Sequence, residues 1–244
     1  MRKYLPPLIL FFLLLIGWQA LALGINAAYI LPTPIQVIQK LCEPLFMVHL
    51  PATMSVTFIG LGISIVLGLA LAIAMDMHEG VRRTLYPLVI ASQTIPTTAI
   101  APLFVLWFGY SIWSKVLVTV LMTFFPITIT VYDGFQSTKR EMEELMLSFN
   151  ASKMDIFMKL KLPNALPYFF SAIKMAIPIS IIGAAIGEWL GAQSGLGYFS
   201  KRMLTQLDGA GVFAPIVLLS AVAMLIVAIV GIIERIAIPW RKEL

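Results

Sequence analysis

Charged residues are scarce in this sequence: Asp, Glu, Lys and Arg make up 12% of its 244 residues, against about 25% in an ordinary soluble domain. A soluble domain of this length would need more polar residues to cover its core, and 60% hydrophobic residues exclude a disordered chain. A nucleic-acid-binding domain is not expected either, although the net charge is +5. The composition, with a mean hydropathy of +0.94, indicates an integral membrane protein without a sizeable soluble domain.

The residues of catalytic and metal sites are also few. One cysteine, Cys42, excludes a disulfide framework and any multi-cysteine metal site. His49 and His78 do not form an HExxH pair, and the chain has no GxxxxGK[ST] phosphate loop. No paired carboxylates fall within one apolar run, so the sequence predicts no catalytic residue, no metal site and no membrane-embedded enzyme.

The apolar residues fall into six runs, each near the ~20 residues that cross a bilayer. The first run could be a secretory signal, because residues 20–22 resemble a cleavage site. It is longer than the apolar region of a usual signal peptide, so we favour an uncleaved helix. The sequence therefore predicts an all-α membrane protein with one domain over residues 1–244 and spans at about 5–23, 54–75, 85–107, 114–132, 168–190 and 212–233.

Orientation follows from the basic residues, which are enriched in cytoplasmic loops. Placing the N-terminus inside leaves Lys40, Lys115, Lys201 and Arg202 outside and Lys174 within a span. An even number of spans also places both termini in the cytoplasm. The inside then carries the larger group of Arg2, Lys3, Arg82, Arg83, Lys139, Arg140, Lys153, Lys159, Lys161, Arg235, Arg241 and Lys242.

Two spans carry small residues at every fourth position, the spacing that lets helix backbones approach closely in lipid. Both stripes are expected to pack within the chain, and a dimer seam is the alternative for one of them. The stripes are Gly60, Ser64, Gly68 and Ala72 in the second span, and Gly183, Gly187 and Gly191 in the fifth.

Prolines interrupt the third span. Pro96 and Pro102 each lack an N–H, which frees the carbonyls of Ser92 and Thr98. Freed carbonyls must face protein or a wet cavity, not lipid. Two interpretations stay open for the polar side chains at this break: they line a passage, or their hydroxyls only satisfy the broken helix. The candidate lining residues are Gln93, Thr94, Pro96, Thr97 and Thr98.

Two ionisable residues fall in the fifth span. Lys174 lies two turns from the cytoplasmic end, where its side chain could snorkel to the interface. Glu188 lies near the outer end beside Trp189, and an acid there is a functional candidate by default. We favour a structural or gating role for Glu188 and Trp189 over solute binding, with a plain interfacial position as the alternative.

The inside segment 133–167 is patterned rather than a simple linker. Residues 137–149 predict an amphipathic helix, and Asn150 suits the left-handed residue that closes a helix. Ser152 and Asp155 form a capping box that starts a second short helix. Pro163 and Pro167 are expected to end it. The pair is either a docking element for a cytoplasmic partner or a surface-lying pair that orders the loop.

This loop resembles the EAA motif of binding-protein-dependent ABC importer permeases, E-A-A, three residues, G, nine residues, I-x-L-P. Every spacing is kept. Leu145 and Met146 replace the two alanines, Asn150 the glycine and Leu160 the isoleucine. The register is Glu144-Leu145-Met146, Asn150 and Leu160-Lys161-Leu162-Pro163.

Further phrases are similar to the nitrate/sulfonate/taurine branch of these permeases, and two resemble permeases for thiamine-pyrimidine precursors. The branch phrases are Leu31-Pro32-Thr33-Pro34, Ile95-Pro96, Ala101-Pro102-Leu103, Trp107-Phe108-Gly109 and Gly195-Leu196-Gly197-Tyr198. The two phrases of the precursor permeases are residues 168–171 and 187–194.

The resemblance implies the type I importer permease fold (MetI-like), with 133–167 as a cytoplasmic coupling helix pair. It implies a homodimer of permeases in a prokaryotic plasma membrane, two ATPase subunits and an extracytoplasmic solute-binding protein. ATP and Mg would be bound by the ATPase, and no cofactor by this chain. The coupling residues would be Glu144, Leu145, Met146, Asn150, Ser152, Asp155, Leu160, Leu162 and Pro163.

The expected function is thus an ATP-driven import pathway for a small polar solute, in the first place a thiamine-pyrimidine precursor. A sulfonate, nitrate or taurine-type solute is the alternative within the family. An ion-coupled secondary transporter is the alternative from another class. It would need intramembrane charges for ion coupling and an inverted repeat. The chain offers Lys174 and Glu188, both near span ends, and no clear internal repeat.

Overall fold

The computed structural model describes residues 5–43 and 45–240, and Arg2, Lys3, Arg241 and Lys242 of the orientation argument lie outside them. All regular structure in the described residues is helical. The elements are α1 (Leu5–Ile25), α2 (Pro34–Leu41), α3 (Leu45–Met77), α4 (Glu79–Ser92), α5 (Thr97–Phe108), α6 (Ile112–Gln136), α7 (Arg140–Ser148), α8 (Lys153–Ile156), the π-turn η1 (Phe157–Lys161), α9 (Leu162–Gly191), α10 (Leu196–Thr205) and α11 (Gly209–Ala237).

Within the described residues, five helical stretches are long and apolar enough to cross a membrane, and a sixth crossing is available if α4 and α5 count as one bent span. This agrees with the all-helical membrane fold expected from the sequence. The long helices extend beyond their predicted spans; α3, for example, begins at Leu45 and α6 continues to Gln136. The five stretches are 5–25, 48–77, 112–136, 153–191 and 209–237.

The predicted third span is not one kinked helix. It is the pair α4 and α5, which meet at an angle of 97°. Pro96 is the residue before α5, with φ −65° and ψ 110°, so the chain is extended where the helix would continue. Pro102 lies inside α5 without ending it. The expectation of a break at Pro96 is therefore correct, and the bend is far sharper than a proline kink.

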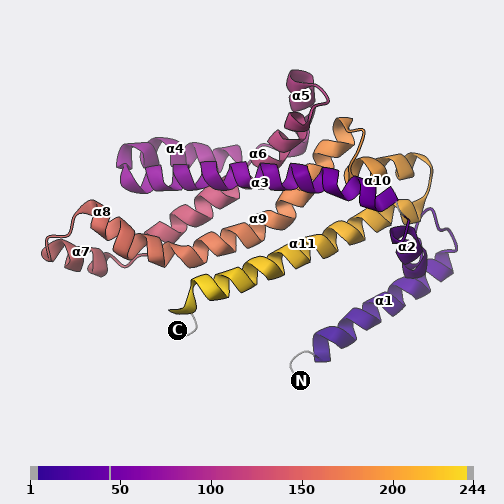
Figure 1. The fold of residues 1–244 in the computed structure, drawn as a ribbon, viewed down its shortest axis with the longest axis horizontal. Coiled ribbons are helices and arrows are strands. Elements are labelled where there is room, and N and C mark those ends of the chain that lie inside the picture. The colour runs from indigo at the N-terminus through magenta and orange to yellow at the C-terminus, as the bar shows by residue number, and fades with distance from the viewer. Residues whose placement is uncertain (1–4, 44, 241–244) are drawn as a thin grey trace.

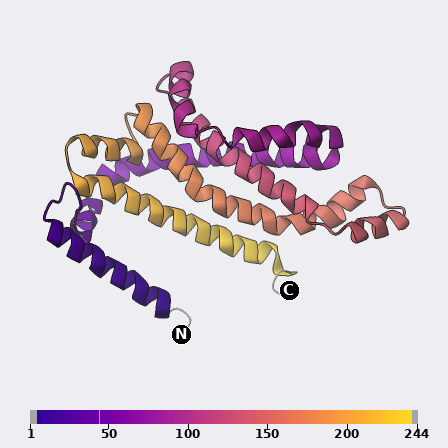
Figure 2. The ribbon, with the colours of Figure 1, turned by 180° about the vertical axis from the view of Figure 1, so that it is seen from behind.

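The molecule is elongated along its helices, with different elements at its two ends (Figure 1). We call the end with α7 and α8 the loop end, and the end with α2 and α10 the α10 end. Helices α3, α6 and α9 form the middle of the bundle, and α11 packs along α9. Most of α1 lies apart from the other long helices in both views (Figures 1 and 2). Near its C-terminal end, Trp18 contacts Phe213 of α11, and its indole Nε1 donates to the Pro32 carbonyl at 3.0 Å.

Helix α6 is the central element because two helices pack closely on it. The stripe on α3 faces it: a Cβ added to Gly60 would lie 2.6 Å from Thr119 Cγ2, and Ser64 Oγ lies 2.6 Å from Thr123 Oγ1. The stripe on α9 faces it too, since a Cβ on Gly187 would lie 2.9 Å from the Lys115 Cα. Both small-residue stripes therefore lie against another helix of the same chain.

The helix after the loop does not end at its prolines, and that expectation is wrong. Elements α8, η1 and α9 follow one another without a break from Lys153 to Gly191. Just before Pro163 the hydrogen bonds widen to the π pattern, with the N–H of Leu162 bonded to the Phe157 carbonyl. This wider register removes the ring clash that a proline causes in a regular α-helix. Pro167 lies within α9.

Candidate functional site

The first candidate site is the helix pair α7–α8, and its turn has a regular geometry. Helix α7 begins at Arg140, later than expected, because α6 continues to Gln136 and Ser137 caps it. Asn150 has φ 59°, in the left-handed region. The N–H of Asn150 donates to Leu147 O at 2.9 Å and that of Ala151 to Met146 O at 3.1 Å. These two bonds are a Schellman motif, which reverses the chain after α7.

The second helix of the pair starts with the capping box read from the sequence. The Ser152 hydroxyl accepts from the N–H of Asp155 at 3.1 Å, and the Asp155 carboxylate accepts from the N–H of Ser152 at 3.3 Å. Lys159 Nζ lies 2.6 Å from Asp155 Oδ1. These contacts fix the start of α8 at Ser152, close behind the turn.

Helix α7 presents apolar side chains that the chain itself does not cover. Met142 is 47% exposed, Leu145 51% and Phe149 79%, while Met146 is half-buried. Glu144 pairs with Arg140 at 2.8 Å on the surface. Exposed apolar surface rimmed by charge is typical of a protein–protein contact.

The helix pair is fixed to the bundle by a buried charge that sequence reasoning missed. Asp76, at the end of α3, has a side chain only 4% exposed. Its Oδ1 accepts from Lys161 Nζ at 3.0 Å and from Gln136 Nε2 at 2.9 Å, and Lys161 also lies 3.5 Å from Glu143 of α7. These partners are distant in sequence. They line a cleft of about 860 Å³ between the loop and the ends of α3 and α6.

The last residues of the expected coupling motif lie on the bundle side of the loop. Leu160, Leu162 and Pro163 are half-buried, and Leu162 packs against the main hydrophobic core. The structure thus separates the motif into an exposed part on α7 and the turn, and a packed part at the start of α9.

The second candidate site is the break between α4 and α5, which brings the expected passage residues together. Gln93, Thr94, Pro96 and Thr98 are exposed and Thr97 is half-buried. The Thr94 hydroxyl donates to Ala91 O at 2.7 Å, within its own broken helix.

Some of these residues also face a cavity. Gln93 and Thr97 line a space of about 170 Å³ together with Met122 and Phe125 of α6. Both sequence-based interpretations of the break therefore have a structural counterpart.

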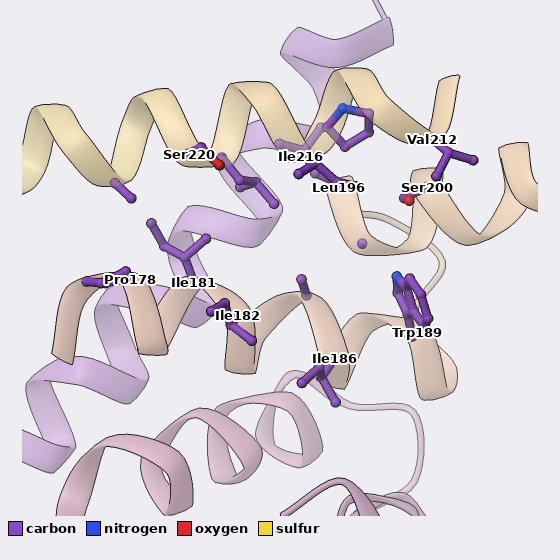
Figure 3. Close-up of a pocket in the computed structure, with 15 residues that line it drawn as sticks. Pro178, Ile181, Ile182, Ile186, Trp189, Leu196, Ser200, Val212, Ile216 and Ser220 are labelled. Carbon is purple, nitrogen blue, oxygen red and sulfur yellow. The ribbon is translucent and has the colours of Figure 1, made fainter. Parts of the chain in front are cut away.

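The third site lies at the α10 end. Glu188 is 2% exposed, so its carboxyl group faces the protein interior. Its Oε2 accepts from Thr53 Oγ1 at 3.1 Å and from the N–H of Gly197 at 2.7 Å. Trp189 is 46% exposed. It lines a cleft of about 370 Å³ between α9, α10 and α11 (Figure 3).

Lys174 does not depend on snorkelling, because it has a partner within the bundle. Its Nζ lies 2.7 Å from Glu234 Oε2, which joins α9 to α11. The Glu234 side chain is 10% exposed and that of Lys174 29%. Sequence reasoning had named no partner for Lys174, since Glu234 lies 60 residues later.

An ion pair also joins α2 to the start of α11. Asp208 caps α11 by accepting from the N–H of Gly211 at 2.9 Å, and Lys40 Nζ lies 3.0 Å from its Oδ2. Burial alone would raise the pKa of Asp208, but the Gly211 N–H and Lys40 outweigh it and lower that pKa. Burial would likewise lower the pKa of Lys40, and its bonds to Asp208 and Glu43 raise it.

Comparison with known proteins gives the family. Residues 64–241 match the model of the "Binding-protein-dependent transport system inner membrane component" family. The chain is 52% identical over 99% of both chains to the formylaminopyrimidine transport permease protein ThiX of Halalkalibacterium halodurans. It is 29% identical to the putative aliphatic sulfonates transport permease protein SsuC of Bacillus subtilis, over 93% of this chain and 84% of that one.

A solved structure has the same fold. It is an inward-facing methionine ABC transporter, MetNI, with a TM-score of 0.60 at 20% identity, covering 82% of this chain and 93% of its own. The family assignment also excludes the ion-coupled secondary transporter considered from the sequence. The chain belongs to the binding-protein-dependent transport-system inner membrane components, and it is a multi-pass permease subunit of an ABC importer.

Proposed function

We propose that this permease forms the import pathway for a thiamine-pyrimidine precursor. The observation that carries the proposal is the 52% identity to a formylaminopyrimidine permease along 99% of both chains. The relative named for aliphatic sulfonates is 29% identical, which makes a sulfonate the weaker alternative. Two copies of the chain would enclose the pathway, without a cofactor in either copy.

We propose further that α7–α8 is the coupling element for a separate ATPase subunit, one under each permease copy. The exposed Met142, Leu145 and Phe149 support this role, since the chain leaves them uncovered. The link from Lys161 to Asp76 supports it too, because it ties the helix pair to α3. Movement of an ATPase against α7 would be transmitted to the bundle through this link.

The loop end is then the cytoplasmic end, in a prokaryotic plasma membrane. The basic residues of α4, α7 and η1 favour that orientation. The N-terminal end of α1 and the C-terminal end of α11 both lie away from the α10 end (Figure 1), as expected of two cytoplasmic termini. The α10 end would face a soluble solute-binding protein.

One test of the coupling role reverses a charge on α7. Glu144→Lys is expected to lower co-purification of the ATPase while leaving membrane insertion intact. The matched control is Glu79→Lys on α4. Glu79 pairs with Arg83 at 2.8 Å just as Glu144 pairs with Arg140, each four residues apart. Such surface pairs are worth only ~0–1 kcal/mol, so loss of the pair itself is a small effect in both variants.

Wild-type ATPase yield with Glu144→Lys would contradict the assigned docking surface, and so would equal losses in both variants.

The solute is tested on the cognate binding protein, which selects it first. Calorimetric titration with formylaminopyrimidine, and with an aliphatic sulfonate as the competitor class, is expected to show binding of the pyrimidine only. Binding of the sulfonate alone would replace the proposed solute by the alternative.

A further inference from the structure

A buried polar cluster joins three helices at the α10 end. Three consecutive amides at the start of α10 donate into it. The N–H of Gly195 donates to His49 Nδ1 at 3.2 Å, that of Leu196 to Thr53 Oγ1 at 2.8 Å, and that of Gly197 to Glu188 Oε2 at 2.7 Å. The cluster therefore links α10 to α3 and to α9, and we call it the α10 latch.

The side chains of the latch are also bonded to one another. The hydroxyl of Thr53 accepts from Leu196 and donates to Glu188 at 3.1 Å, so this one side chain serves both neighbouring helices. Thr53 is 0% exposed, Glu188 2% and His49 8%. A carboxyl group at a helix N-terminus is favoured by the helix dipole and by the free N–H groups there.

Two glycines are required for this approach. Gly195 has φ 111°, a backbone conformation that residues with a side chain rarely adopt. A Cβ at Gly195 would clash with the Glu188 carboxyl group, and one at Gly197 would clash with the backbone of Ala185 on α9 and with Glu188. The phrase Gly195-Leu196-Gly197 is therefore shaped to hold Glu188.

Burial of a carboxyl group carries a large desolvation penalty, so it stabilises helix packing little. Apolar residues of similar volume are often as stabilising or more so. The directional bonds of the latch instead fix where α10 lies. Its Leu196, Gly197 and Ser200 form one wall of the cleft that Trp189 and Ile182 of α9 line from the other side (Figure 3).

We propose that Glu188 is a positioning residue that holds α10 to α9 and α3, so that these three elements move as one unit in the transport cycle. The proposal rests on the proposed import function for its role, and on the geometry above for its contacts. When the latch is broken, ATP hydrolysis continues, but movement of α9 no longer carries the α10 wall with it.

The test compares two equal substitutions one turn apart on α3. Thr53→Val keeps the side-chain shape, and it removes both the donor to Glu188 and the acceptor of Leu196. Thr57→Val is the control: Thr57 is 1% exposed, and its hydroxyl donates to Thr53 O in the same helix at 2.9 Å. Glu188→Ala breaks the latch from α9 and serves as the second variant.

The first readout is hydrogen–deuterium exchange of the amides of residues 195–197 in the intact complex. Thr53→Val and Glu188→Ala are expected to speed exchange about tenfold or more, given the cost of losing a bond to a charged or buried group. Thr57→Val is expected to match the wild type. This readout needs no solute, so it stands even if the proposed solute is wrong. Unchanged exchange in both latch variants would overturn the proposal.

The second readout is formylaminopyrimidine transported per ATP hydrolysed in vesicles, which does not depend on the amount of folded complex. The ratio is expected to fall about fivefold or more in the latch variants, the lower end of ordinary coupling energies. Faster exchange with an unchanged ratio would show a merely structural contact and would overturn the positioning role. A wild-type complex that moves no pyrimidine would contradict the proposed function instead.

Discussion

At the scale of single residues, the close approach of α3 to α6 depends on the absence of a side chain. A Cβ on Gly60 would lie 2.6 Å from Thr119 Cγ2, whereas a Cβ on Gly62 of the same helix would meet nothing within 4 Å. Backbone proximity between helices is what small residues provide in a membrane. Gly60 is thus a packing position, and Gly62 is open.

This difference gives a stability prediction. Gly60→Ala is expected to destabilise the detergent-solubilised complex by about 1–3 kcal/mol, the usual cost of overpacking. Gly62→Ala is expected to be neutral or slightly stabilising, because alanine favours the helix. Thermal unfolding of both variants measures the effect. Equal midpoints for the two would contradict the packing assigned to the stripe.

The role of a single residue could be predicted where it depends only on neighbours in the sequence. Asn150 and Ser152 follow from capping preferences that act within four residues. The partners of Glu188 and Lys174 were not predictable, since Thr53 lies 135 residues from Glu188 and Glu234 lies 60 from Lys174. Pairs of this kind depend on how the helices pack, which one sequence does not specify.

At the scale of elements, the predicted third span is broken into two helices, α4 and α5. The sequence predicted the break from Pro96, but not its angle of 97°. The angle depends on packing of α5 against α6 and α9. Thr97 lies at this corner and lines a cavity of about 170 Å³ with Met122 and Phe125.

Filling that corner is expected to slow import. Thr97→Leu should lower uptake roughly twofold to thirtyfold, from couplings of ~0.5–2 kcal/mol along connected elements, with ATPase assembly unchanged. Thr84→Leu is the control, since Thr84 is exposed on α4 and its hydroxyl donates to Gly80 O in that helix. Wild-type uptake with Thr97→Leu would contradict the assignment of this corner to the passage.

At the scale of the whole molecule, most charged residues that the structure describes lie toward the helix ends or in pairs between helices. The apolar runs predicted where the long apolar helices lie, because a run of about 20 apolar residues is long enough to cross a bilayer as a helix. Their arrangement around α6 required the structure. The loop end carries the exposed apolar side chains of α7 and the buried ion pair between Lys161 and Asp76. The α10 end carries the latch. In the proposed function, a separate ATPase acts on the loop end, and the bundle transmits its movement to the α10 end.

The most direct test is uptake of labelled formylaminopyrimidine into vesicles that contain the permease, its ATPase and its binding protein. We expect uptake that requires ATP inside and the binding protein outside, and that persists when ion gradients are collapsed. Uptake that continues without ATP and stops when the ion gradient is removed would contradict it.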